Sequence, residues 1–368
     1  MNGNAVQEIS GYLEKAVEAK ASDLFLVAGA QPAMRVDGRL SRSGDRLSPD
    51  DTARLLDGLY ALAGRPMDRY LSDCGDDFSL ALPGRARFRA NAYRQRGSAS
   101  MVLRIVPFGI PDPDAMGVPD AVMGLSGLQG GLVLVTGSAG SGKSTTLACV
   151  IDRINRERDV HIVTLEDPIE YLYRNAEGIV SQREVGLDVP SFAAGLRDCL
   201  REAPDVILLG EMRDGEAAQA AMSAAETGHL VFATLHTKGA ANAVDRVVDM
   251  FPPSQQAQAR AQLAMTCDTV LFQELLPGAS GGRVPAFEIL KFTPAVRSLV
   301  REGRAHQLDA AMADGARGGM VRMRDAVAGL VSRGLVSRED AARALPGIDM
   351  APEAAPEAAP EAKPRRRW

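Results

Sequence analysis

The stretch GLVLVTGSAGSGKS, residues 131–144, decides the fold of this 368-residue chain. Its first half is a short apolar run rich in β-branched residues, which is typical of a buried parallel strand. Its second half matches G-x-x-x-x-G-K-[ST], and residues 145–155 then carry apolar side chains at helical spacing. Strand, glycine loop and helix in this order predict an α/β domain that binds a nucleoside triphosphate. A chance match in a glycine-rich chain, the alternative, leaves both flanks unexplained.

Each part of this loop has a chemical task. Glycines let backbone N–H groups curl around a phosphate, and the N-terminus of the next helix attracts the same anion. Lys143 is placed to reach the β- and γ-phosphates, and the Ser144 hydroxyl to ligate Mg²⁺. We therefore expect ATP and Mg²⁺ as cofactors. The expected binding residues are Gly137, Ser138, Ala139, Gly140, Ser141, Gly142, Lys143, Ser144 and Thr145.

The bulk composition is that of a globular protein long enough for two cores, with 46% hydrophobic and 24% charged residues. A net charge of −5 and an aromatic content of 5% give no reason to expect nucleic-acid binding. No run of about 18 apolar residues stands out, and the first residues show neither a basic nor an apolar region, so we expect no membrane span and no signal peptide. Its four cysteines are widely separated and form no C-x-x-C pair, which argues against a zinc site and favours a reducing, cytoplasmic location.

The residues before the loop predict a small α+β domain over 1–106, followed by a linker over 107–118 that is rich in proline and has no periodicity. The expected helices cover 4–20 and 48–62. The expected strands cover 23–28, 31–40 with a turn at Asp37-Gly38, 77–82, 86–93 and 98–106.

Strand-like and helix-like runs alternate through residues 119–293, the pattern of a parallel α/β sheet. The expected strands are 132–136, 160–165, 206–210 and 230–235, with weaker ones near 269–275 and 284–290. Helices dominate 294–347. The repeat PEAAPEAAPEAKPRRRW at the end has almost nothing to bury, so residues 348–368 are predicted to be disordered.

Two acidic segments follow predicted strands: TLEDPIE, residues 164–170, and PDVILLGEMRD, residues 204–214. Parallel sheets place ligand sites beyond the C-terminal ends of their strands, where these carboxylates fall. An ATPase needs acids to hold a metal and to position or deprotonate the attacking water. Glu211 has the form of a Walker B acid, so Ser144 and Glu211 are the expected metal-binding residues. A solvated helix cap is the alternative for any one acid, and two such clusters make it the weaker explanation.

The segment TGHLVFATLHT, residues 227–237, holds two of the four histidines, one at each end of a strand. Seven extended residues separate them by about 23 Å, too far to share one metal. His236 is expected to hydrogen-bond around the γ-phosphate, and His229 to act at a neighbouring surface. A packing role is the alternative for either histidine.

The motifs GSAGSGKSTTL, TLEDPIEY, LREAPDVILLGEMRD and AAETGHLVFATLHT, in this order, resemble those of the secretion ATPase superfamily. Within it, the chain most resembles the type IV pilus retraction ATPases, the PilT/PilU-like twitching-motility motors. RFRAN, residues 87–91, and QREVG, residues 182–186, also match the family pattern.

This resemblance implies a cytoplasmic homohexamer that hydrolyses ATP to retract a pilus. Each subunit would have an N-terminal PAS-like domain, a flexible linker, a RecA-like core and C-terminal helices. The ring would work peripherally at the inner membrane on a pilus platform protein, with a paralogous retraction ATPase as a further partner.

The resemblance also implies roles for individual residues. Glu170 would activate water, Glu211 would take the Walker B role, and His236 would belong to the histidine box. Arg96 and Arg104 would contact the nucleotide across the ring, although either arginine could equally be a surface residue.

Related functions stay open at this point. Pilus-assembly and type II secretion ATPases usually carry a four-cysteine zinc module and a longer N-terminal region, and the sequence shows neither. AVRSLVRE, residues 295–302, resembles the AIRNLIRE motif tied to retraction, whereas DLFL, residues 23–26, is closer to the accessory PilU type. A scaffold that binds ATP without turnover has no need of Glu170 and Glu211, and a nucleic-acid translocase is disfavoured by the low aromatic content.

Overall fold

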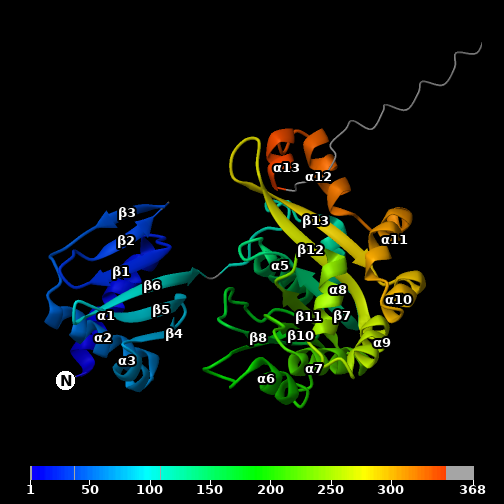
Figure 1. Ribbon diagram of the computed structural model, residues 1–368. Coiled ribbons are helices and arrows are strands. Elements are labelled where there is room, and N and C mark those ends of the chain that lie inside the picture. Colours follow the sequence, from blue (N-terminus) through cyan, green and yellow to red (C-terminus); the bar gives the residue numbers. More distant parts are fainter. Residues whose placement is uncertain (1, 37, 108, 345–368) are drawn as a thin grey trace, which may run out of the picture.

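The computed structural model describes residues 2–36, 38–107 and 109–344 and contains two β-sheets, each with its own helices (Figure 1). The first sheet has six strands in the order β3-β2-β1-β6-β5-β4, and all its neighbouring strands are antiparallel. The second has seven strands in the order β13-β12-β7-β11-β10-β8-β9. The disorder predicted for 348–368 and the turn residue Asp37 lie outside the described residues.

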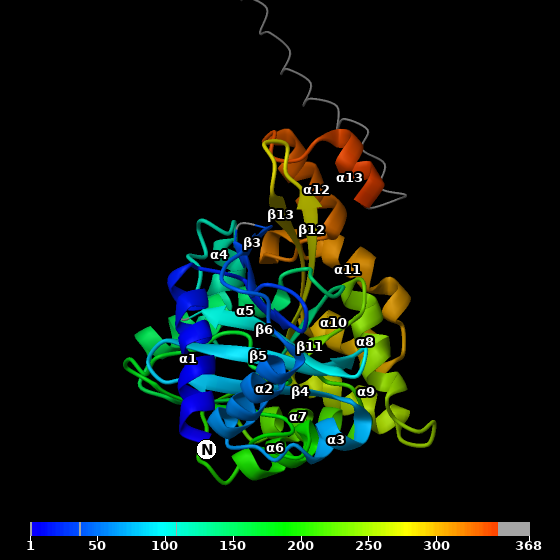
Figure 2. The same cartoon turned by 90° about the vertical axis from the view of Figure 1, so that its left-hand side faces the viewer.

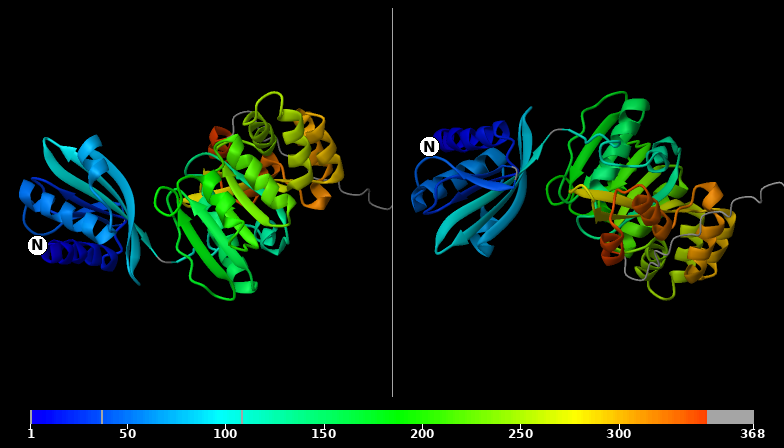
Figure 3. Two further views of the ribbon diagram at one scale, coloured as in Figure 1. Left: turned by 90° about the horizontal axis from the view of Figure 1, so that it is seen from below. Right: turned by 90° about the horizontal axis from the view of Figure 1, so that it is seen from above.

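The first sheet belongs to the N-terminal part of the chain. Its strands are β1 (Asp23–Val27), β2 (Ala33–Val36), β3 (Arg39–Arg42), β4 (Gly75–Leu82), β5 (Ala86–Gln95) and β6 (Ser98–Pro107). Helices α1 (Asn2–Glu18) and α2 (Pro49–Ala63) cover one face of this sheet, and the opposite face turns toward the larger sheet (Figures 2 and 3). Helix α3 (Asp68–Asp73) packs against β4. The segment predicted over 31–40 with a turn forms the antiparallel pair β2 and β3, and the turn includes Gly38, where φ is 77°.

Helix α2 begins where the sequence predicts it. The Ser48 hydroxyl accepts a hydrogen bond from the Asp51 N–H, and the Asp51 carboxylate accepts one from the Ser48 N–H, which forms a capping box. The Ser48 hydroxyl also donates to the Asp51 carboxylate, and this bond, with those from the Ser48 N–H and from Arg54, lowers the pKa of Asp51 to about 2. The helix packs so closely on α1 that only glycine fits at position 58, since a Cβ there would lie 2.4 Å from the Ala5 carbonyl oxygen.

The second sheet carries the phosphate loop. Its strands are β7 (Gly131–Thr136), β8 (His161–Glu166), β9 (Ile179–Glu184), β10 (Val206–Leu209), β11 (Leu230–Leu235), β12 (Cys267–Pro277) and β13 (Arg283–Lys291). All six strands expected from the sequence are present. The sequence does not predict strand β9, because IVSQRE is largely polar and most of its side chains are half-buried at the sheet edge. Strand β13 forms a hairpin with β12 and runs antiparallel to it. All the remaining neighbouring strands in this sheet are parallel.

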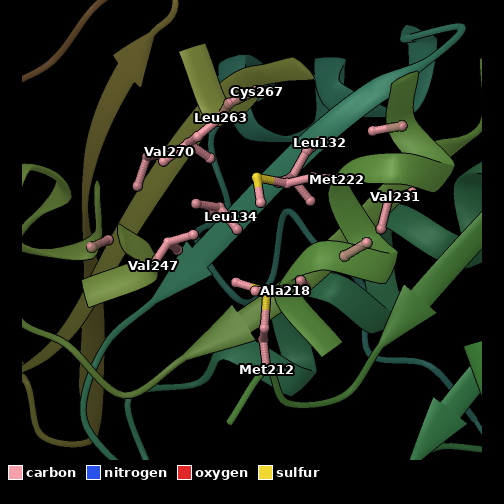
Figure 4. Packing of buried hydrophobic residues seen from close by; sticks show 14 of the residues in the cluster. Leu132, Leu134, Met212, Ala218, Met222, Val231, Val247, Leu263, Cys267 and Val270 are labelled. Carbon is pink, nitrogen blue, oxygen red and sulfur yellow. The ribbon is translucent and has the colours of Figure 1, made fainter. Parts of the chain in front are cut away.

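Helices cover both faces of this sheet. The α-helices are α4 (Asp120–Met123), α5 (Lys143–Glu157), α6 (Phe192–Cys199), α7 (Gly215–Glu226), α8 (Ala240–Asp249), α9 (Gln256–Thr266), α10 (Pro294–Arg301), α11 (Leu308–Asp314), α12 (Met323–Ser332) and α13 (Arg338–Ala344). Leu132 and Leu134 pack with residues of α7, α8 and α9 (Figure 4), whereas Val133 and Val135 pack with residues of α5. Burial on both faces explains why these strands are apolar throughout.

Helices α12 and α13 pack on the β12–β13 hairpin. Their cluster joins Phe272 and Leu276 of β12 to Met323, Val327 and Leu330 of α12. Among the described residues, no helix combines the length and the apolar character needed to cross a membrane.

The four cysteines differ sharply in accessibility, and this gives a direct test of the fold. Cys74 is exposed, whereas Cys149, Cys199 and Cys267 are buried. Burial raises the pKa of Cys149 to about 11 and that of Cys199 to about 12, and it raises the pKa of Cys267 as well. Since the thiolate is the reactive form, we expect a thiol reagent at pH 8 to label Cys74 alone in the native protein and all four cysteines in urea. Mass spectrometry identifies the labelled cysteines, and rapid labelling of Cys267 in the native protein would contradict this packing.

Candidate functional site

The phosphate loop connects β7 to α5 and depends on three glycines with positive φ. Gly137, Gly140 and Gly142 have φ of 148°, 76° and 89°. A Cβ at Gly137 would lie 2.4 Å from the Gln273 carbonyl oxygen and 2.5 Å from Ser141 Oγ. Helix α5 begins at Lys143, so its positive end points into the loop. This backbone is the cradle that a phosphate chain requires.

Lys143 is buried within the loop. Its ammonium group donates hydrogen bonds to the carbonyl oxygens of Gly137, at 2.7 Å, and Ser138, at 2.9 Å. Burial lowers the pKa of Lys143, while the charges of Glu211 and Glu170 act in the opposite direction. These two acids, predicted from separate segments, therefore lie close enough to influence the same ammonium group.

A cavity of about 450 Å³ opens beside the loop. Its lining residues are Met116, Val118, Gly140, Gly142, Lys143, Ser144, Thr145, Thr146, Glu170, Gln273, Leu275, Arg283 and Pro285. Met116, Val118, Leu275 and Pro285 offer apolar surface, and the loop side offers charge and hydroxyl groups. An apolar wall beside a phosphate cradle suits a nucleotide, which has a flat base at one end and anionic oxygens at the other.

The acidic segment 166–170 ends β8 and reaches this cavity. Glu170 is exposed and lines the cavity, whereas Glu166 is buried. The Glu166 carboxylate accepts hydrogen bonds from the Thr164 hydroxyl, at 2.7 Å, and from the Gln182 amide, at 3.2 Å. Burial raises the pKa of Glu166. The first acid of the segment is thus held inside the fold, where its carboxylate also accepts from the Glu170 N–H at 3.4 Å, and the third, Glu170, faces the cavity.

Glu211 follows β10 and is held by Arg213 and His236. Arg213 Nε donates to Glu211 Oε2 at 2.6 Å, and its Nη1 donates to Asp167 Oδ2 at 3.4 Å. His236 Nε2 lies 3.2 Å from Glu211 Oε1. The strand ends of β8, β10 and β11 therefore converge, as the sequence predicted for their carboxylates and for His236.

Three predicted residues lie elsewhere. His229, at the other end of β11, lies 2.9 Å from the Ala224 carbonyl oxygen through its Nδ1. Arg104 pairs with Asp23 at 3.2 Å on the N-terminal sheet, and Arg96 is exposed in the β5–β6 turn with a φ of 50°. Neither arginine lines the phosphate-loop cavity of its own chain.

Within the described ranges, no three His, Cys, Asp or Glu side chains gather closely enough to hold a metal ion unaided. Mg²⁺ at ATP-binding sites normally takes one or two protein ligands together with phosphate oxygens and water. The exposed Ser144 hydroxyl in the cavity and the nearby Glu211 fit that limited role.

Sequence reasoning missed several residues of the site. Arg283, from the β12–β13 hairpin, donates to the Gly140 carbonyl oxygen at 3.3 Å and lines the cavity. The hydroxyl groups of Tyr171 and Thr145 lie 2.8 Å apart, which joins the acidic segment to α5. Each of these contacts depends on tertiary structure, and no local pattern assigns Arg283 or Tyr171 a role in the site.

Residues 2–343 match the family model described as Type II/IV secretion system protein, and the chain belongs to this family. The phosphate loop and its converging acids are therefore the site of a nucleotide-binding member of that family.

Individual relatives are similar over nearly their whole length. The type IV pilus retraction ATPase PilT of Pseudomonas aeruginosa is 42% identical over 91% of this chain and 97% of its own. The type IV pilus ATPase PilU of the same strain is 37% identical over 91% of this chain and 87% of its own. A crystal structure of the pilus retraction motor PilT with bound ADP superimposes with a TM-score of 0.82 at 45% identity, covering 91% of this chain and 96% of that one. The predicted α/β fold and family are confirmed.

The glycine cradle can be tested directly. We expect Gly137→Ala to weaken ATP binding, because its Cβ would meet backbone and Ser141 Oγ. Backbone strain of about 1–3 kcal/mol corresponds to a loss of about 5- to 150-fold in affinity. Gly127→Ala is the matched control, since a Cβ there has nothing within 4 Å. Titration of a fluorescent ATP analogue measures both variants, and equal affinities would refute the close packing of the loop.

Proposed function

We propose that this chain is the ATP-hydrolysing subunit of a motor that retracts type IV pili. The observation that carries the proposal is the phosphate-loop cavity itself, where Lys143 and Glu170 share one lining and Glu211 lies close by. The similarity to PilT over 97% of its length, and to a PilT structure with bound ADP, supports the same conclusion.

In the proposed mechanism, the N–H groups of residues 137–145 bind the phosphates and Lys143 neutralises their charge. Glu170 accepts a proton from the attacking water, since it is the acid that faces the cavity. His236 and Arg213 hold the Glu211 carboxylate in place. Ser144 and Glu211 would hold Mg²⁺, which when bound spreads the charge that develops on the γ-phosphate.

The assembly we propose is a cytoplasmic homohexamer, associated peripherally with the inner membrane through a pilus platform protein. Each subunit would contain a PAS-like domain over 1–106, a linker over 107–118, an ATPase core over 119–293 and a helical region over 294–347. Arg96 and Arg104 would reach nucleotide only from a neighbouring subunit, because neither lines the cavity of its own chain.

A PilU-like accessory role is the second candidate. It is favoured by 37% identity to PilU, and PilT and PilU occur in the same Pseudomonas aeruginosa strain. A paralogous retraction ATPase would then be a partner of this chain. A pilus-assembly or type II secretion ATPase is the third candidate.

The enzymatic part of the proposal is tested with two variants. We expect Lys143→Ala to lose ATP binding, since the loop would keep its N–H groups but lose its buried cation. We expect Glu211→Gln to bind ATP and to hydrolyse it at least about 100-fold more slowly, the loss typical when one group that stabilises the transition state is removed. Phosphate release and ATP titration measure both effects. Near-normal turnover of Glu211→Gln would overturn its assigned role.

The cellular part is tested by deleting the gene in its host and counting pili by electron microscopy. Abundant pili that fail to retract support the retraction motor. Cells without pili support an assembly ATPase, and normal retraction that weakens only under load supports the accessory role.

A further inference from the structure

The N-terminal part of the chain touches strand β9 of the second sheet through one largely buried ion pair. Arg87 lies on β5 of the first sheet, and Glu184 lies at the end of β9 at the edge of the second. Arg87 Nη2 donates to Glu184 Oε2 at 2.8 Å, with side-chain exposures of only 13% and 7%. A buried pair of this kind is costly to break, because the remaining charge is left without a partner.

The same oxygen of Glu184 has a second donor. The Ile169 N–H donates to Glu184 Oε2 at 3.1 Å, and Ile169 immediately precedes Glu170. One carboxylate oxygen therefore binds both the guanidinium of the N-terminal part and the backbone of the acidic segment. Any movement of Arg87 that shifts this oxygen also changes the hydrogen bond beside Glu170.

Strand β9 holds the other side of Glu170 as well. Gln182 lies two residues before Glu184 and so on the same face of the strand. Its amide N–H donates to the Tyr171 carbonyl oxygen at 2.8 Å, and its amide oxygen accepts from the Tyr173 N–H at 3.0 Å. Glu184 and Gln182 thus fix the backbone directly before and directly after Glu170.

We propose that Arg87 is a positioning residue for ATP hydrolysis: it acts through Glu184 on the placement of Glu170 and thereby couples the orientation of the N-terminal part to turnover. This inference rests on the proposed ATPase function and assigns a role to the RFRAN and QREVG segments. With the Arg87–Glu184 pair formed, Glu170 is held toward the cavity. When the N-terminal part moves away, the Glu184 oxygen that accepts from the Ile169 N–H loses its cationic partner and can shift, while the hydrogen bond from the Glu170 N–H to Glu166 Oε2, at 3.4 Å, does not depend on Arg87.

The test compares Arg87→Gln with Arg85→Gln in the full-length protein. Arg85 is the matched control, because it pairs with Glu18 in an exposed ion pair within the N-terminal part, 3.7 Å apart. Misplacement of a catalytic group by about 1 Å can cost on the order of 100-fold in rate, so we expect kcat of Arg87→Gln to fall at least about tenfold. Its KM and the directly titrated ATP affinity should stay within about twofold of wild type, since the phosphate loop is untouched. Arg85→Gln should behave like wild type.

Two further variants separate positioning from simple loss of structure. Glu184→Gln keeps an acceptor for the Ile169 N–H but removes the charge that Arg87 needs, so we expect an intermediate kcat. In a Glu170→Asp background, Arg87→Gln should lower kcat much less than it does alone, because both changes act on the same carboxylate. All rates are measured well below the melting temperature of each variant.

The inference is overturned if Arg87→Gln lowers only the melting temperature while kcat stays at the wild-type value. It is also overturned if ATP affinity falls in step with kcat, or if the losses from Arg87→Gln and Glu170→Asp multiply independently. Failure of the proposed function would look different, since the wild-type protein itself would then release no phosphate from ATP.

Discussion

The structure depends on the backbone of one short loop, which must present N–H groups to an anion in a conformation that side chains resist. Three glycines with positive φ meet that requirement between β7 and α5. The neighbouring strands supply the rest of the site. Because β8, β10 and β11 run parallel to β7, their C-terminal ends reach the same edge of the sheet, and their acids and His236 arrive near Lys143. The fold thus converts a parallel strand order into a cluster of charges around a phosphate site.

The parts that could be read from the sequence are those fixed by local rules. The strand, loop and helix over 131–155, the capping box at Ser48 and the acids that end apolar strands all follow from neighbouring residues. Strand β9 could not be read in this way, since an edge strand faces solvent in part and its polar sequence carries no apolar period. Strand β13 was placed correctly along the chain, but its antiparallel direction is set by its hairpin with β12.

The residues of the site also divide into those that local sequence patterns indicate and those that only the folded structure reveals. Lys143 and Glu170 lie in short segments that stand out in the sequence, and both line one cavity. Arg283 belongs to no such segment, and the segment around Glu211 gives Arg213 no role in the sequence. What matters for each is the atom that it meets after folding: a carboxylate after another strand for Arg213 and the carbonyl oxygen of Gly140 for Arg283. The pair formed by Arg87 and Glu184 spans 97 positions of sequence, and no local pattern could have joined its members.

Strand β12 has a consequence for how this protein tolerates change. Its side chains alternate between two environments: Gln273 and Leu275 line the nucleotide cavity, while Phe272 and Leu276 pack on α12. A helix with no residue in the cavity therefore forms the backing of one of its walls. Substitutions in α12 can therefore change the affinity for nucleotide without altering a residue that lines the cavity. Relatives with identical phosphate loops need not bind ATP with the same affinity.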